Sequence, residues 1–170
     1  KEKVFEEEKK KALEEIKALE EKKEQAQKSA EELKKVQLVS GSFNSEDAGY
    51  KGYKQVTLTL NVKNNTEKAI SRIYAIGTIK FEGREVPWIR ESFNYTIDGG
   101  IEPGETKEVS LQPNMFSSWG TVNITENANL NIEFVRIDGA EGIILATTQD
   151  FTQKDNQRLE DLKAKYINKW

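Results

Sequence analysis

The 170-residue sequence contains no histidine and no cysteine. Without histidine it lacks the commonest general base of enzymes and the commonest metal ligand. Without cysteine it has no thiol nucleophile, no thiolate ligand and no disulfide. No apolar run approaches the roughly 20 residues that a membrane-spanning helix needs. Acids are the main groups left for catalysis, and they fall largely at expected turns, so the sequence is not typical of an enzyme.

The first forty residues lack arginine, aspartate, glycine and proline, and they contain eleven lysines and eleven glutamates. Glu, Lys, Ala, Leu and Gln are strong helix formers. The segment therefore predicts one helix from Lys3 to about Leu38. Its charges cancel, so the net charge of −3 arises in the rest of the chain. No basic patch stands out, and we expect no nucleic-acid partner.

Apolar residues on this helix recur every seven positions in one complete row and one partial row. Two complete rows would predict a coiled coil. One and a half rows leave two interpretations open: a helix that self-associates, or a solvated helix lightly docked on a partner. The complete row is Phe5, Ala12, Leu19, Ala26 and Leu33, and the partial row is Lys9, Ile16, Lys23, Ala30 and Gln37.

From Val36 onward the period changes to the alternation of β-strands. The clearest runs are Tyr53–Lys63, in which Val56, Leu58, Leu60 and Val62 share one face, and Ile70–Phe81. Short turns between the runs indicate antiparallel pairing and a β-sandwich. The other expected strands are 36–43, 85–97, 106–111, 130–138 and 142–151, with a short one at Val122 and Ile124, and a polar loop is expected from Asn44 to Gly52.

After the last strand, Thr152 has the character of a helix N-cap. Leu159, Leu162, Tyr166 and Trp170 then fall on one stripe at helical spacing. Such a stripe needs a cover, which is either the β-sandwich or the apolar row of the first helix. An even number of strands would place the two helices at the same end of the sandwich, whereas an odd number would require the chain to fold back.

Three segments together have a familiar layout: Val56–Thr66 with its Asn-rich turn, the long run Ile70–Phe81, and Ile101–Thr106 with a Pro-Gly-Glu turn. This layout resembles the immunoglobulin-like domains of bacterial envelope lipoproteins, of the FxLYD type and its telokin-like relatives. The resemblance covers roughly 36–151. The literal Phe-x-Leu-Tyr-Asp signature is missing, and Lys80–Gly83 stands near that position.

The resemblance implies an immunoglobulin-like β-sandwich, an extracytoplasmic location in the cell envelope or in secreted form, and a binding or structural role without catalytic residues. The expected organisation is a charged helical stalk (1–38), the β-sandwich (39–151) and a C-terminal amphipathic helix (152–170). Because the sequence begins with Lys1 rather than Met, we expect that a signal segment ending at a lipid-bearing cysteine preceded it. Membrane attachment would then occur only through that anchor.

Candidate chemistry in the acids is limited. Two acid pairs, Glu82 with Glu85 and Asp98 with Glu102, could flank a sugar as glycosidase acids do. Both pairs lie at strand ends and turns, where solvated acids are ordinary. The acidic loop 44–47 does not have the ligand spacing of an EF-hand. We therefore expect no catalytic residue, no metal and no cofactor.

Aromatic residues offer better candidates for a binding surface. Trp88 falls in an expected strand, and a tryptophan in a β-sandwich most often belongs to the core. Phe116 and Trp119 lie in the irregular stretch 113–120, where exposed aromatics on a rim can stack on sugars or grip a protein. We predict partner contact at Phe116 and Trp119, with core packing as the other interpretation of Trp119.

The function indicated is a non-enzymatic binding or structural module of the bacterial cell envelope. A helix of about 35 residues, roughly 50 Å long, would hold the β-sandwich away from its anchor. Two alternatives remain open. One is an oligomerising adaptor that acts through its helix, and the other is a carbohydrate-binding module.

Overall fold

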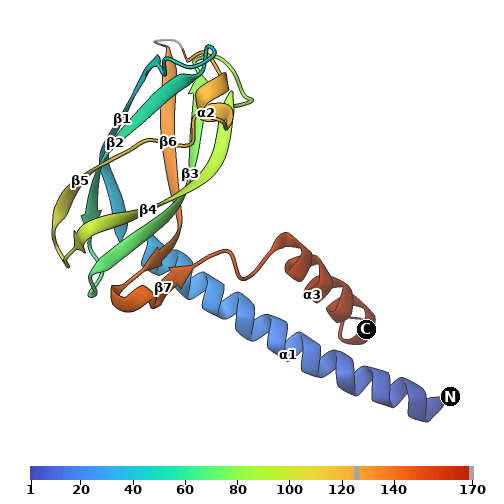
Figure 1. Cartoon of the computed structure of the whole chain (residues 1–170). Helices are drawn as coiled ribbons and strands as arrows, with labels where there is room; N and C mark the ends of the chain where they lie inside the picture. Colours follow the sequence, from blue (N-terminus) through green and yellow to red (C-terminus); the bar gives the residue numbers. More distant parts are fainter. Residues whose placement is uncertain (125–126, 169–170) are drawn as a thin grey trace.

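The computed structural model describes residues 1–124 and 127–168. These residues form a mostly β structure with one long helix at the start and a shorter helix at the end, as predicted (Figure 1). Seven antiparallel strands are described, in two sheets with the orders β1-β2-β5 and β4-β3-β6-β7. The elements are α1 (Glu2–Leu33), β1 (Val36–Asp47), β2 (Lys54–Asn64), β3 (Ile70–Phe81), β4 (Ile89–Ile101), β5 (Thr106–Leu111), α2 (Ser118–Thr121), β6 (Ala128–Asp138), the 3-10 turn η1 (Ala140–Gly142), β7 (Ile144–Thr147) and α3 (Gln153–Tyr166).

The hydrophobic core lies between the two sheets, within what we call the β-unit (residues 36–147). Alternate side chains of β2 and β3 are buried, which confirms the predicted inward face of each strand. Each fully buried Leu, Ile or Val contributes about 1.5–3 kcal/mol relative to an exposed position. The inward residues are Val56, Leu58, Leu60 and Val62 on β2, and Ile73, Ala75, Gly77 and Ile79 on β3.

Several strand limits differ from prediction. β1 continues to Asp47, because its polar residues pair with β2 as an exposed edge strand. β4 begins only at Ile89 and continues through Gly99 and Gly100 to Ile101. Both glycines have positive φ, at 76° and 66°, where the pairing with β3 shifts register. A side chain at Gly100 would lie 2.8 Å from the carbonyl oxygen of Ile70, so only glycine fits this bulge.

Residues 122–124 form no strand, so the short strand expected at Val122 and Ile124 is wrong for the residues that the structure describes. Both side chains are instead partly buried against the core. The last strand is also much shorter than expected. β7 spans only four residues, Ile144–Thr147, and the chain then leaves the sheet.

A buried polar clasp fixes the end of the β-unit that adjoins α1. Asn64 is fully buried, and its side-chain amide donates to the carbonyl oxygens of Lys68 and Ile101, each at 2.8 Å. Its side-chain oxygen accepts from the backbone N–H of Thr66 at 2.9 Å and from the Thr66 hydroxyl at 2.6 Å. Because every polar group of the Asn64 side chain is bonded, the turn from β2 to β3 is tied to the end of β4.

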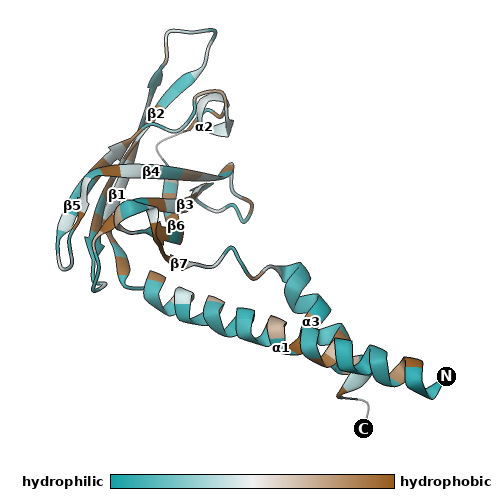
Figure 2. Cartoon of the chain, turned by 60° about the horizontal axis from the view of Figure 1, so that its bottom comes forward, coloured by the Kyte–Doolittle hydropathy of each residue, from teal (hydrophilic) through white to brown (hydrophobic). Residues whose placement is uncertain are grey.

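The helices α1 and α3 lie side by side beyond the sheets and are antiparallel: α1 runs toward the sheets and α3 runs away from them, as Figure 2 shows. An odd number of strands was expected to separate the chain ends, yet the helices pair. The reason is the short β7: after four residues the chain turns away at the end of the sheet where α1 enters. Thr152 is the N-cap of α3, as predicted, and it forms a capping box with Asp155.

Candidate functional site

The structure separates the two residues predicted to contact a partner. The side chain of Phe116 is 62% exposed, whereas that of Trp119 is only 2% exposed and belongs to the core. Core packing, the other interpretation of Trp119, is therefore correct. A buried indole offers no surface to a partner. The prediction of partner contact now depends on Phe116 and remains a prediction.

Trp119 enters the core from the short helix α2, and two features hold it there. The Glu91 carboxylate on β4 accepts from the backbone N–H of Ser118 at 3.2 Å and from its hydroxyl at 2.6 Å. On β3, Gly77 leaves space for the indole, since a side chain there would lie 2.7 Å from the Trp119 ring. The indole thus fills the core space beside Gly77, where β3 itself contributes no side chain.

Trp88 does not belong to the core, contrary to prediction. It lies in the turn before β4 and is 47% exposed, because the strand begins one residue later at Ile89. Its ring packs on that of Phe81, with centroids 4.9 Å apart, and the Arg84 guanidinium lies 6.0 Å from its centroid. Trp88 is therefore exposed where a core position was expected, whereas Trp119 has the core position that was one of its two interpretations.

Phe116 belongs to a group of three aromatic rings at the end of the β-unit away from the long helices. We call Tyr50, Tyr53 and Phe116 the far-pole aromatic cluster. The two tyrosine rings are stacked, with centroids 5.9 Å apart. Phe116 meets them edge-on, at 6.2 Å from Tyr50 and 5.2 Å from Tyr53. Tyr50 is 47% exposed, and the Lys51 ammonium lies 5.4 Å from its centroid.

The local chain explains how this cluster forms. The hairpin between β1 and β2 reverses through Gly49, Lys51 and Gly52, all with positive φ. The Tyr53 backbone N–H donates to the Tyr50 carbonyl oxygen at 2.8 Å, which sets the two rings side by side. Phe116 is held in its own turn, where its N–H donates to the Asn114 side chain at 3.0 Å. Figure 1 shows this hairpin and α2 at the end of the sheets opposite α1 and α3.

Sequence reasoning found Phe116 but missed its tyrosine neighbours. Tyr50 falls in the expected polar loop from Asn44 to Gly52, and Tyr53 falls at the start of the expected strand Tyr53–Lys63. The signal that could have found them is two aromatic residues three positions apart within a glycine-rich hairpin turn. Their contact with Phe116, which is more than sixty positions away, depends on the fold and has no local signal.

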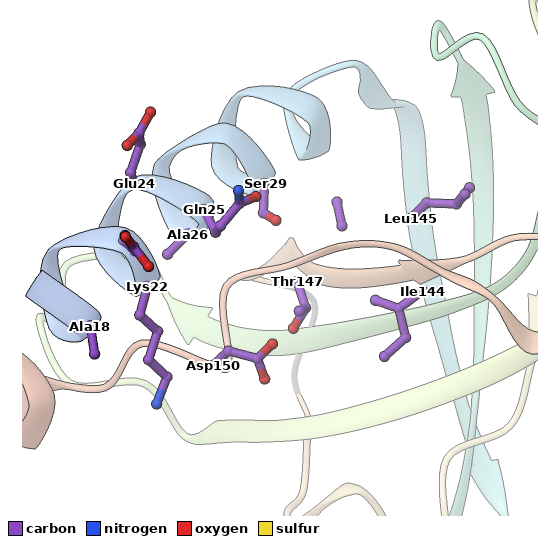
Figure 3. A pocket seen from close by; sticks show the side chains of 12 residues that line it. Ala18, Lys22, Glu24, Gln25, Ala26, Ser29, Ile144, Leu145, Thr147 and Asp150 are labelled. Carbon is purple, nitrogen blue, oxygen red and sulfur yellow. The ribbon is translucent and has the colours of Figure 1, made fainter.

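Apart from the far-pole aromatic cluster, a concave region lies between α1 and β7 (Figure 3). Its volume is about 840 Å³. Figure 3 shows Ala18, Lys22 and Gln25 of α1 facing Thr147 of β7 and Asp150 across an open gap. Small side chains on the helix, among them Ala18, Ala26 and Ser29, leave this space, although α1 and β7 are in contact. Among the described residues that line it, Glu21, Glu24 and Asp150 form no group that could hold a metal ion.

The charged groups that show shifted pKa values lie mainly where α1 meets α3. Arg158 donates two hydrogen bonds to the Glu15 carboxylate, at 2.9 and 3.1 Å, which lowers the pKa of Glu15. The pKa of Asp155 is lowered by the backbone N–H of Thr152 and by Lys22. Lys163 pairs with Glu20 at 2.7 Å. These shifts come from ion pairs and a helix cap, which are structural roles.

The acids considered as chemical candidates show ordinary turn contacts. Asn44 donates to Glu46 at 3.1 Å, and Asp47 accepts from the Gly49 backbone N–H at 2.9 Å. Within the described residues, no group of three or more acids is placed to hold a metal ion. Of the two acid pairs, Glu82 and Glu85 lie in the connection from β3 to β4. Asp98 lies within β4, contrary to the turn that was expected there, and Glu102 directly follows that strand.

The long first helix uses its apolar row against three different neighbours. Phe5 packs on Tyr166 with ring centroids 6.2 Å apart, and Ala12 and Leu19 pack with Leu159 and Leu162 of α3. Further along the row, Ala26 faces the gap beside β7, and Leu33 joins the core of the β-unit. The fourth residue of the α3 stripe, Trp170, lies outside the described residues.

No protein-family model matches this chain, and no curated protein matches it. Among the helices of the described residues, none is long and apolar enough to cross a membrane.

Proposed function

We propose that this chain is a non-enzymatic binding module that presents the far-pole aromatic cluster on a paired-helix stalk. The observation that carries the proposal is that two different kinds of surface lie at opposite ends of the molecule. The charged helices lie at one end, and three clustered aromatic rings lie at the other. Exposed Tyr and Phe rings at a loop tip supply contact area at low entropic cost, which suits recognition of a protein or a glycan.

We further propose that the β-unit is an immunoglobulin-like sandwich of a bacterial envelope lipoprotein. The strand order supports this: strands 1, 2 and 5 share one sheet and strands 3, 6 and 7 the other, as in immunoglobulin constant domains. The fourth strand differs, since β4 pairs with β3 instead of β5. A lipid-acceptor cysteine encoded just before Lys1 would support the envelope location, and an upstream segment without an apolar stretch would contradict it.

The paired helices favour a spacer over an oligomerising adaptor. Pairing with a second chain would need the apolar face of α1, and α3 of the same chain already covers Ala12, Ile16 and Leu19 on that face. Three ion pairs between the two helices fix how α3 is aligned along α1: Glu15 with Arg158, Glu20 with Lys163, and Lys22 with Asp155. Equal monomer masses by light scattering, with and without residues 152–170, would remove the adaptor alternative.

The surface test uses purified bacterial cell-wall sacculi and a glycan array as probes. Each of two contacting rings contributes more than about 1 kcal/mol at a typical hot spot. We therefore expect Tyr50→Ala with Phe116→Ala to weaken retention at least tenfold. Phe5→Ala is the matched control, because it removes an exposed ring from the stalk. Retention on both probes favours the carbohydrate-binding alternative, and retention on sacculi alone favours a protein or peptide component. Absence of retention, or equal retention of the double variant, contradicts the proposal.

A further inference from the structure

One edge of β6 is left without a partner along most of its length. On one side, β6 pairs with β3 from Ala128 to Asp138. On the other side, β7 pairs only with Arg136–Asp138, and the Thr148 N–H donates to the Val135 carbonyl oxygen at 3.0 Å. No described strand pairs with this side of residues 128–134. The seven residues therefore present backbone N–H and C=O groups at alternate positions, as the edge of any sheet does.

The free edge of β6 borders a groove, whose opposite side is formed by β1 beside Ala128–Leu130 and by the last turn of α1 with the start of β1 beside Ile132–Phe134. β1 pairs with β2 alone and also contacts β6, so the edges of the two sheets meet here. Two hollows follow the edge, one of about 560 Å³ beside Ala128–Leu130 and one of about 310 Å³ beside Ile132–Phe134. The unpaired run 128–134 is about 23 Å long, so an added strand of about seven residues would match its length.

The groove has an apolar floor that the chain itself does not cover fully. Leu130, Ile132 and Phe134 of β6 pack on the core but stay half-buried, as do Leu38 and Phe43 of β1. In β2, which is paired on both sides, the inward side chains are at most 1% exposed and thus more deeply buried than those of β6. The two sheets are thus incompletely closed along this seam. An added strand with apolar side chains at alternate positions would complete the burial.

The run 128–134 also lacks the features that usually protect a sheet edge. It contains no lysine and no proline, and its one charge, Glu133, is exposed. Edges that must stay free typically carry lysine, proline or an inward-pointing charge. β7, in contrast, is short and contacts α1. The unpaired edge of β6 is therefore longer than β7 and lacks the residues that protect an edge.

We propose that the free edge of β6 binds an extended peptide as an added strand. The occupant is a single segment of about six or seven residues, continuing the line of β7, with apolar residues at alternate positions. A basic residue opposite Glu133 would add a favourable cross-strand pair. A second copy of this chain fits less well, because β1 on the opposite side of the groove blocks the approach of another folded sheet.

The test uses a phage-displayed library of linear dodecapeptides, selected against the full chain and followed by synthesis of the enriched sequences. Strand addition depends on backbone hydrogen bonds, so N-methylation of alternate peptide amides should weaken binding at least tenfold in one of the two alternations and little in the other. Bound peptide should also slow hydrogen exchange of amides within 129–134. Absence of enriched peptides, insensitivity to N-methylation in both alternations, or unchanged exchange of these amides overturns the proposal.

Protein variants locate the site. Ser45 lines the larger hollow, and Ser45→Tyr should fill it and weaken peptide binding at least tenfold. Thr59→Tyr is the control, since Thr59 lies on β2 and lines neither hollow. The double variant Tyr50→Ala with Phe116→Ala should leave peptide binding unchanged, so this proposal and the proposed far-pole contact can fail separately. Equal loss with Thr59→Tyr would contradict the assignment to β6, and the N-methyl comparison tests the native chain even if Ser45→Tyr does not fold.

Discussion

Substitution of Gly77 by alanine tests the packing that removes Trp119 from the surface. The new Cβ would lie 2.7 and 2.9 Å from two atoms of the Trp119 ring and 3.1 Å from the Phe93 ring. These distances are too short, and the indole is 2% exposed with little room to move. Overpacking of a core typically costs about 1–3 kcal/mol. Alanine regains about 0.5–1 kcal/mol over glycine within a strand, so we expect a net loss of about 1–2 kcal/mol.

Rescue distinguishes steric conflict from a general defect. Trp119→Phe alone leaves a cavity and should destabilise the protein by roughly 1–3 kcal/mol. In the double variant, the alanine methyl occupies part of that cavity, so the combined loss should be at least about 1 kcal/mol smaller than the sum. Urea denaturation measures all four stabilities. Gly41→Ala is the control, because its nearest neighbour is a flexible Leu38 methyl at 3.3 Å, and it should be neutral or stabilising. Additive losses, or an equal loss for Gly41→Ala, would refute the packing argument.

Three further expectations concern the helix pair and the clasp. Leu159→Ala should loosen α3 by about 2–5 kcal/mol without unfolding the sheets, seen as faster hydrogen exchange within 153–166 only; global unfolding would contradict this. Because the pKa values of Glu15 and Asp155 are lowered in the folded state, their stabilisation is complete above the unfolded values of 4.5 and 3.8 and is lost as the pH falls through the lower folded values. Protection of α3 amides, taken relative to the intrinsic exchange rate at each pH, should therefore fall between pH 6 and pH 3, and unchanged protection would argue against the pairs. Asn64→Ala leaves buried groups without partners and should cost about 3 kcal/mol in urea denaturation, so a loss below about 1 kcal/mol would show that the clasp contributes little.

The sequence was most informative where one periodic signal determined burial. β2, β3 and β5 were located to within a residue because apolar side chains alternate strictly along them. The N-cap at Thr152 was also identifiable, since its chemistry is local. The two apolar stripes left the cover of the last helix open between the β-sandwich and the first helix. The strand-count argument did not decide it, because the chain leaves the sheet after four residues of β7.

The parts that were not predictable depend on contacts between distant segments. The burial of Trp88 is decided by where β4 starts, and that of Trp119 by the space above Gly77. The polar end of β1 was read as a loop because an exposed edge strand has no apolar alternation. The far-pole aromatic cluster brings Phe116 against a hairpin far away in the chain, so its composition could not be derived from spacing.

The central claim is that the far-pole aromatic cluster is the contact surface. The most direct measurement is a two-dimensional NMR titration of the isotope-labelled full chain with soluble fragments of the cell-wall sacculi. We expect the shifts to concentrate in residues 48–53 and 114–117 and to disappear in the Tyr50→Ala, Phe116→Ala double variant. Shifts confined to α1 and α3, or a pattern that the double variant leaves intact, would contradict the account.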